Sequence, residues 1–266
     1  MKLPKITTKQ QEILKLLYRY RFANRIQIQT LMHHKDRRRI GAWLKDLREK
    51  EYIEWIYSTD FAEKTKPAVY YLGINGVRFL KTLDEYPVEE VRKRYRDYTR
   101  QTDFIARSLL VVDSVINLEE RSSNTNGLEY SFAVSSDYLD QNSNCHFLHD
   151  LAPDLYYEKH ERSLNGTATT SYLVAIFDAT LPRYMVKKRL KEYVTYLYEG
   201  DWRDDTSSRE FIIHIVCPTK ADLIYAKRRT RLLLEDTGRD ESTHIRFSTT
   251  ESVRLHGVMG IIREEV

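Results

Sequence analysis

Residues 36–50 hold the densest set of side chains with an obvious chemistry, because basic residues crowd one short segment. With Asp36 as the N-cap of a helix, apolar side chains from Ile40 to Leu47 recur at helical spacing and point inward. The basic side chains then face water or a ligand. Lys and Arg neutralise phosphates, and Arg pairs bidentately with guanine, so this face suits nucleic-acid recognition; the plain alternative is a solvated helix face. The residues predicted to contact DNA are Arg37, Arg38, Arg39, Lys45 and Arg48, with Lys64 and Lys66 on a following hairpin.

Two carboxylates, Asp154 and Asp178, form a second candidate site. Metal-dependent cleavage of a phosphodiester needs carboxylates that hold Mg²⁺ and usually a lysine that orients the attacking water. Only a lysine from the next predicted helix, such as Lys188, is available for that role. The structural alternative is that Asp154 caps a turn and Asp178 ends a strand. We favour an inactive scaffold and therefore expect no cofactor, with Mg²⁺ required only if the nuclease alternative holds.

The other clusters of potentially reactive side chains give weaker evidence for a functional site. Cys145-His146-Phe-Leu-His149-Asp150 brings metal-capable side chains together, but their spacing matches no common zinc pattern. The second cysteine, Cys217, has no cysteine near it in the chain, so we expect neither a disulfide framework nor a metal site. No Gly-rich phosphate loop is visible, which argues against nucleotide hydrolysis.

The elements around the cationic segment predict a winged helix-turn-helix in residues 1–84. Two shorter helices precede the segment, one over Ile13–Tyr18 and one over Asn24–Leu31. After it, strands over Tyr52–Ser58 and Ala68–Leu72, separated by a polar tip, form a hairpin wing. Three helices and a wing make the DNA-binding unit that would place the cationic helix in the major groove.

Charge is distributed unevenly along the chain. Residues 1–50 hold 14 Lys and Arg against 4 Asp and Glu, and residues 51–100 hold 9 against 9. The remaining residues are acidic, since the whole chain is only +4. Phosphate attraction is therefore expected to bring the first 50 residues onto DNA first.

Length and composition predict two domains. A chain of 266 residues with 41% hydrophobic and 31% charged residues can bury two modest cores. A proline near residue 87 marks the boundary, after which a connector helix is predicted over residues 85–120. No apolar run is long enough to span a bilayer and no signal peptide is visible, so we expect a cytoplasmic protein that does not engage a membrane.

Residues 121–266 read as an α/β domain. Strands are predicted near 130–134, 155–158, 172–177, 211–216 and 245–248, with helices over 183–198 and 221–234. This order resembles the restriction-endonuclease-like core, in which Pro-Asp opens the second strand and acid-x-Lys ends the third. The matching residues are Pro153-Asp154 and Asp178-Ala179-Thr180. Because Thr180 stands in the place of the lysine, the resemblance implies a catalytically degenerate domain.

The chain as a whole resembles the replication-relaxation family. The residues that carry this resemblance are Tyr70–Gly76, Pro153-Asp154, Val174–Thr180 and Arg189–Tyr193. The family's strand ends tend to read acid-x-Asp-Arg-Gly-Thr, whereas this chain has Ile176 and Ala179 in place of the acid and the arginine. The resemblance implies a winged helix joined to a nuclease-like domain, and an association with plasmids and mobile elements of Gram-positive bacteria.

The function that we predict is double-stranded DNA binding in plasmid or mobile-element replication or mobilisation, by a protein that is not itself the nicking enzyme; we favour the absence of enzymatic activity. The alternatives are a Mg²⁺-dependent nuclease that uses Asp154 and Asp178, and a winged-helix transcriptional repressor. Expected partners are double-stranded DNA, other replication or relaxosome proteins, and a second copy of the chain, since palindromic sites suit homodimers.

Overall fold

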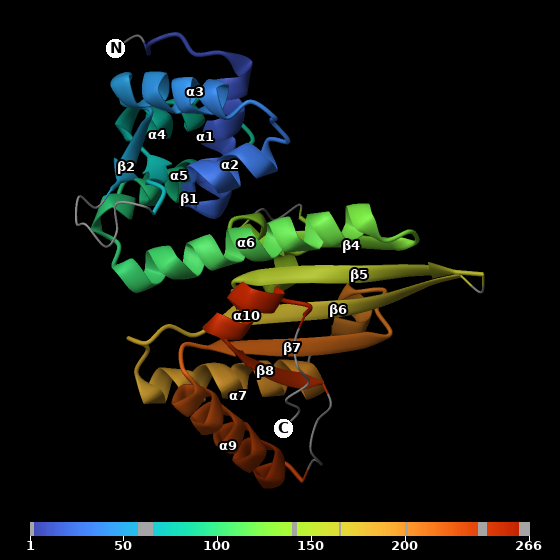
Figure 1. Cartoon of the computed structure of the whole chain (residues 1–266). Helices are drawn as coiled ribbons and strands as arrows, with labels where there is room; N and C mark the ends of the chain where they lie inside the picture. Colours follow the sequence, from blue (N-terminus) through green and yellow to red (C-terminus); the bar gives the residue numbers. More distant parts are fainter. Residues whose placement is uncertain are drawn as a thin grey trace. The chain divides into compact units, whose positions relative to one another are not determined.

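Figure 1 presents the fold as a computed structural model, which describes residues 3–57, 66–139, 143–164, 166–199, 202–238 and 244–260. The chain divides into two compact units, Met1–Val112 and Asp113–Val266. Both units mix helices and strands, as expected for an α+β chain. The first unit extends beyond residue 84, because segments predicted as a connector are packed into it.

Three capped helices open the first unit: α1 (Thr8–Tyr20), α2 (Arg25–Leu31) and α3 (Arg37–Glu49). Each begins after a side chain that accepts backbone N–H groups, which satisfies donors that a helix start leaves unpaired. The caps are Thr7, Asn24 and Asp36. Apolar side chains at helical spacing, such as Leu14, Ile28 and Leu44, meet in one core. These helices confirm the three predicted from the sequence.

A small antiparallel sheet completes this part of the unit. Its strands are β1 (Ala23–Asn24), β2 (Ile53–Ile56) and β3 (Val69–Leu72), in the order β1-β3-β2. The predicted hairpin is confirmed by the pairing of Ile53 with Leu72 and of Ile56 with Val69. Next comes α4 (Ile74–Leu80), where a Cβ on Gly76 would lie 2.3 Å from the Tyr52 carbonyl oxygen. Only glycine permits this close approach of α4 to the start of β2.

The prediction of one long connector helix over residues 85–120 is wrong. The structure has α5 (Val88–Arg94), a 3₁₀ turn η1 (Asp97–Thr99) and α6 (Thr102–Asn124). The break lies at Asp97, whose carboxylate is buried and pairs with Arg21, the residue that ends α1. Because a buried carboxylate needs such a partner, the chain turns where the pair forms.

The second unit is built on a five-stranded mixed sheet. Its strands are β4 (Leu128–Val134), β5 (Leu155–Ser163), β6 (Gly166–Ile176), β7 (Glu210–Cys217) and β8 (Ile245–Thr249), in that spatial order. The pairs among β4, β5 and β6 are antiparallel, whereas β6, β7 and β8 are parallel. All five strands were predicted, but β5 and β6 form a hairpin longer than expected.

Helices α7 (Arg183–Glu199) and α9 (Lys220–Asp236) connect the parallel strands and pack on the same face of the sheet (Figure 1). Their apolar side chains, including Leu190, Tyr193 and Leu223, meet Leu173, Phe211 and other strand residues in the main core. Two short helices were not predicted, α8 (Trp202–Asp205) and α10 (Thr250–His256). Among the described residues, no helix is both long and apolar enough to cross a membrane.

Candidate nucleic-acid interface and other polar sites

Helix α3 carries the predicted cationic face. The Asp36 carboxylate accepts the backbone N–H groups of Arg38 at 2.8 Å and Arg39 at 3.3 Å. These hydrogen bonds lower the pKa of Asp36, so its charge persists near the positive end of the helix dipole. Ile40, Leu44 and Leu47 are buried, as predicted, which fixes the rotation of the helix.

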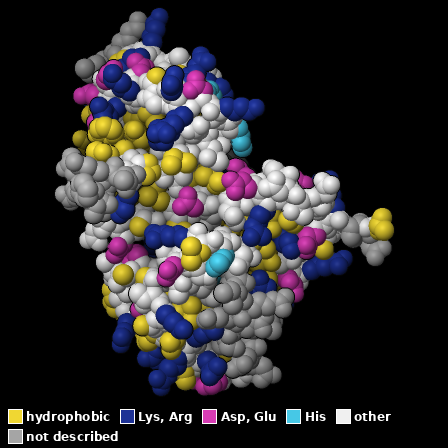
Figure 2. Space-filling view, in the orientation of Figure 1, with side chains coloured by type: hydrophobic (Ala, Val, Ile, Leu, Met, Phe, Trp, Pro, Cys, Tyr) yellow, Lys and Arg dark blue, Asp and Glu magenta, His cyan; other side chains and the backbone are white. Residues whose placement is uncertain are grey.

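That rotation leaves most of the predicted contact residues in solvent. The exposed cations of α3 are Arg37, Arg38, Arg39 and Lys45, while Arg48 is half-buried. Figure 2 shows Lys and Arg side chains over the part of the molecule that holds α3 in Figure 1, with a hydrophobic patch beside them.

The cations of α3 differ in what they contact. Arg37 and Arg38 make no ion pair with any described residue, whereas Lys45 Nζ lies 3.8 Å from a Glu49 carboxylate oxygen. The Arg48 guanidinium carbon lies 3.8 Å from the centroid of the Trp55 ring in β2. Arg48 is therefore held against the hairpin by a cation–π contact, which the sequence did not predict.

A hollow lies between α3 and the hairpin. It measures about 240 Å³ and is lined by Gly41, Leu44, Lys45, Arg48, Trp55 and Tyr70. The lining combines aromatic and aliphatic walls with two cations and holds no carboxylate. The hollow adjoins the cationic face because Lys45 belongs to both.

The hairpin lysines are only partly described. Lys66 is exposed just before β3. Lys64 lies in residues 58–65, outside the described part of the chain. Their predicted contacts with the DNA backbone stay predictions.

The two candidate carboxylates lie at the same end of the β5–β6 hairpin. The Asp154 carboxylate accepts the backbone N–H of Ile176 at 2.7 Å, two residues before Asp178. Asp178 in turn accepts the backbone N–H of Thr180 at 3.2 Å and its hydroxyl at 2.8 Å. Both carboxylates thus accept backbone N–H groups at the end of β6, as expected if Asp154 caps a turn and Asp178 ends a strand.

The third predicted catalytic residue does not complete the site. Lys188 is exposed on α7 and its Nζ lies 3.8 Å from a Glu192 carboxylate oxygen one turn along the same helix. Thr180, in the place of the motif lysine, is bound to Asp178. Among the described residues, no group of three or more His, Cys, Asp or Glu is arranged to hold a metal ion.

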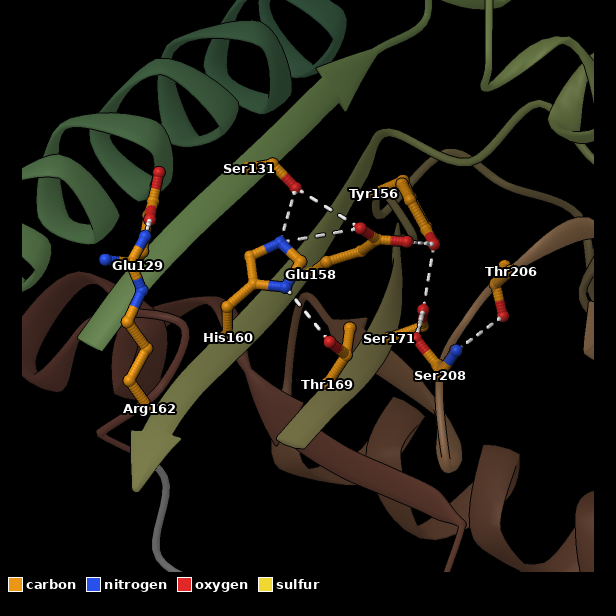
Figure 3. Close-up of polar contacts among 10 residues, drawn as sticks. All are labelled: Glu129, Ser131, Tyr156, Glu158, His160, Arg162, Thr169, Ser171, Thr206 and Ser208. Atoms are coloured by element: carbon orange, nitrogen blue, oxygen red, sulfur yellow. Dashed lines mark hydrogen bonds and ion pairs between the residues drawn. The ribbon is translucent and has the colours of Figure 1, made fainter. Parts of the chain in front are cut away.

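A polar network that was not predicted spans β4, β5 and β6 (Figure 3). Ser131 Oγ lies 3.2 Å from His160 Nε2, and His160 Nδ1 lies 3.1 Å from the Thr169 hydroxyl. Glu158 accepts the Tyr156 hydroxyl at 2.7 Å and the Ser131 hydroxyl at 3.4 Å. A hydroxyl beside an imidazole is the pairing that nucleophilic catalysis uses, but here a threonine, not a carboxylate, contacts the far side of the ring.

Proton counting indicates what this network does. Because Tyr156 donates to Glu158, it must accept from Ser171 at 2.8 Å, and Ser171 then accepts from Ser208 at 2.6 Å. The chain of hydroxyls ties β5 and β6 to the segment before β7. The sequence signal was the alternation Tyr156, Glu158, His160, which places polar groups on the face of β5 that also holds the core. The network closes the polar end of that core.

The Cys145–Asp150 segment is also structural. It contains a 3₁₀ turn, η3 (His146–Leu148). His146 Nδ1 lies 3.0 Å from the Tyr138 carbonyl oxygen, and His149 Nδ1 lies 3.1 Å from Asp150. Burial raises the pKa of Cys145 to about 11, which leaves the thiol protonated at neutral pH.

His214 in β7 is the most strongly perturbed histidine in the described part of the chain. It is 1% exposed, and its Nε2 lies 2.7 Å from the Ser248 hydroxyl of β8. Burial, followed by the charge of Arg246, lowers the pKa of His214 from 6.5 to about 3. The folded chain therefore keeps this imidazole neutral at any pH above about 3.

We expect acid to destabilise the second unit through His214. Below pH 6.5 the His214 imidazole of the unfolded chain is protonated, whereas in the folded chain it stays neutral down to about pH 3. The free energy of unfolding therefore falls as the pH decreases from 6.5 to about 3. At about pH 5 this loss amounts to about 2 kcal/mol relative to neutral pH. Denaturant unfolding at the two pH values measures it, and His214→Asn should flatten the pH dependence; an identical pH dependence in both proteins would contradict the assignment.

Comparisons with known proteins give a family and distant structural likenesses. A family model described as replication-relaxation matches residues 14–215. No curated protein matches the chain. Two solved structures of restriction endonuclease FokI, one of them bound to DNA, are similar at 13% and 12% sequence identity, with TM-scores of 0.32 and 0.29. Each match covers 94% of this chain and 44% of FokI, so the chain spans less than half of the endonuclease. TM-scores at this level assign neither fold nor activity.

Proposed function

The chain belongs to the replication-relaxation family, and from that premise we propose that it binds double-stranded DNA in the replication or mobilisation of a plasmid or related mobile element. The observation that carries the proposal is the exposed cationic face of α3, which its cap at Asp36 and its buried apolar side hold in a fixed orientation. Helix α3 is then the recognition helix and β2–β3 the wing of a winged helix.

Two further observations support this proposal. Helices α1, α2 and α3 followed by a β-hairpin have the order of a winged helix-turn-helix. The first 50 residues also hold 14 Lys and Arg against 4 Asp and Glu, an excess that attracts phosphates. In this proposal Arg38 and Arg39 read base edges, whereas Lys66 contacts the backbone.

The second unit would serve recruitment or dimerisation in the cytoplasm. Its order, α6, three strands, α7, β7, α9 and β8, supports a nuclease-like domain that has lost its catalytic lysine. Such a domain offers a scaffold for a second copy of the chain or for other replication proteins.

Binding to duplex DNA is the test of this proposal. Purified protein is mixed with labelled fragments of its own replicon and excess competitor DNA, and complexes are resolved by gel retardation at several salt concentrations. A discrete complex on one fragment is expected, with affinity falling by a slope of about 0.9 per phosphate contact in a log–log salt plot. Failure to retard any fragment, even at low salt, would refute the proposal. Selective binding to an operator beside its own gene would instead favour a repressor.

A nuclease that uses Asp154 and Asp178 is the second candidate, favoured by their position at one end of the β5–β6 hairpin. The donor set does not fit that chemistry, since Thr180 replaces the lysine and both carboxylates accept backbone N–H groups. We therefore expect supercoiled DNA to stay uncut during incubation with the protein and Mg²⁺ or Mn²⁺. Cleavage that disappears in Asp178→Ala would contradict this expectation and establish the nuclease.

A further inference from the structure

Three consecutive side chains at the end of β2 are unusually exposed for their size. Trp55, Ile56 and Tyr57 are 43%, 41% and 46% exposed. The Trp55 and Tyr57 rings lie 5.7 Å apart, centroid to centroid, with 21° between their planes. Large apolar side chains gathered on a surface commonly mark a binding site. Of the three, Trp55 lines the hollow between α3 and the hairpin, where Tyr70 is the second aromatic side chain.

The opposite side of the hollow is a single stripe of α3. Gly41, Lys45 and Arg48 recur at helical spacing and all line it. The Lys45 side chain is exposed, and the Arg48 guanidinium lies against Trp55. Aromatic rings beside cations are the combination that proteins use for single-stranded nucleic acid, because bases stack on the rings while phosphates meet the charges.

The presence of glycine at position 41 is independent evidence that the hollow binds a ligand. It lies in the interior of α3, where glycine is less favourable than alanine. A Cβ on Gly41 would meet no atom of the described residues within 4 Å, so packing in this part of the chain does not require glycine. An occupant of the hollow would require it, because a methyl group there would reduce the space.

Size and charge indicate the kind of occupant. At about 240 Å³ the hollow is smaller than the pockets that hold drug-sized ligands, so it suits one flat ring system. Its lining holds two cations and no carboxylate, which complements an anionic chain. A nucleobase with its neighbouring phosphate satisfies both conditions.

We propose that this hollow receives one unpaired base of DNA, which takes the place of the Arg48 guanidinium on the face of Trp55, with a flanking phosphate at Lys45. The proposal rests on the proposed function and extends it, since it adds a site for locally opened DNA beside the surface for duplex DNA. The protein would then hold a duplex through Arg38 and Arg39 and at the same time trap a base that has left the stack.

The experiment compares two duplexes of one sequence, one fully matched and one with a single bulged 2-aminopurine. Affinity is measured by anisotropy of an end label, and stacking by quenching of 2-aminopurine fluorescence. We expect the bulged duplex to bind more tightly and its fluorescence to be quenched. Trp55→Leu should remove the quenching and weaken bulge binding by about 10- to 100-fold, with matched-duplex affinity unchanged.

Three further variants separate a binding role from a structural one. Gly41→Ala should raise the thermal unfolding midpoint and still weaken bulge binding, which damage to the fold cannot explain. Trp55→Phe should retain most of the quenching. Tyr98→Leu, which removes a tyrosine that is 63% exposed elsewhere in the first unit, should change neither measurement.

The outcomes distinguish this inference from the proposed function. Matched-duplex binding without preference for the bulge and without quenching would overturn the inference and leave the proposed function standing. Equal losses on both duplexes in Trp55→Leu would also overturn it, because Trp55 would then only support α3. Failure to bind the matched duplex, with quenching of the bulge intact, would refute the proposed function alone.

Discussion

Replacing Asp97 by alanine is expected to lower the free energy of unfolding of the first unit by about 3–5 kcal/mol. Asp97 is 1% exposed and forms an ion pair with Arg21. A second arginine, Arg100, places its Nε 3.8 Å from the same carboxylate. Without Asp97, these guanidinium groups would lose the anion that compensates their burial.

A third arginine increases the expected loss. Arg94 is 6% exposed, and its pKa is lowered first by burial and then by the charge of Arg21, whereas Asp97 acts in the opposite direction. Asp97 is therefore the anion shared by three arginines from α1, α5 and the segment after η1. Removing it leaves a cluster of like charges in a site from which water is largely excluded.

Denaturant unfolding of the full-length protein measures this effect. Asp84→Ala is the matched control, because Asp84 is exposed and its loss should change stability little. Asp97→Asn separates charge from shape, since asparagine keeps the volume but cannot neutralise the arginines. A loss below about 1 kcal/mol in Asp97→Ala would show that the arginines find other anions or water.

Asp97 also illustrates what the sequence could not predict. The 88–120 segment has helix-forming residues throughout, so local propensity favours one helix. The break depends on Arg21, 76 residues away in the chain, and such a partner is invisible to any local pattern. By contrast, α3 was predicted closely because its cap and its apolar spacing lie within the helix itself.

The candidate sites also differ in how much of each could be predicted from the sequence. Exposure of Arg37, Arg38 and Arg39 follows from the rotation of one helix, which its own periodicity sets. The contact between Arg48 and Trp55, and the hollow beside it, depend on where the hairpin packs on α3, so they required the structure. The long β5–β6 hairpin was underestimated for a related reason. Its polar outer half, including Lys159 and Glu161, is held by cross-strand pairing and not by burial.

The double substitution Arg38→Ala/Arg39→Ala is expected to weaken binding to a specific duplex site by about 30-fold or more, since each bidentate contact to a base contributes about 1–3 kcal/mol. The fold should be unaffected. Asp36 caps α3 through the backbone N–H groups of these two residues, which alanine retains. Removing two cations from the positive end of the helix dipole also relieves a small repulsion.

The matched control is Lys187→Ala/Lys188→Ala, which removes the same charge from exposed positions on α7 in the other unit. Comparison of the two variants separates recognition from general phosphate attraction, because net charge changes equally in both. If α3 reads base edges, only the first variant loses discrimination between its site and competitor DNA. If both variants lose affinity equally on every sequence, the contribution of α3 is electrostatic alone, and specificity must come from another part of the chain.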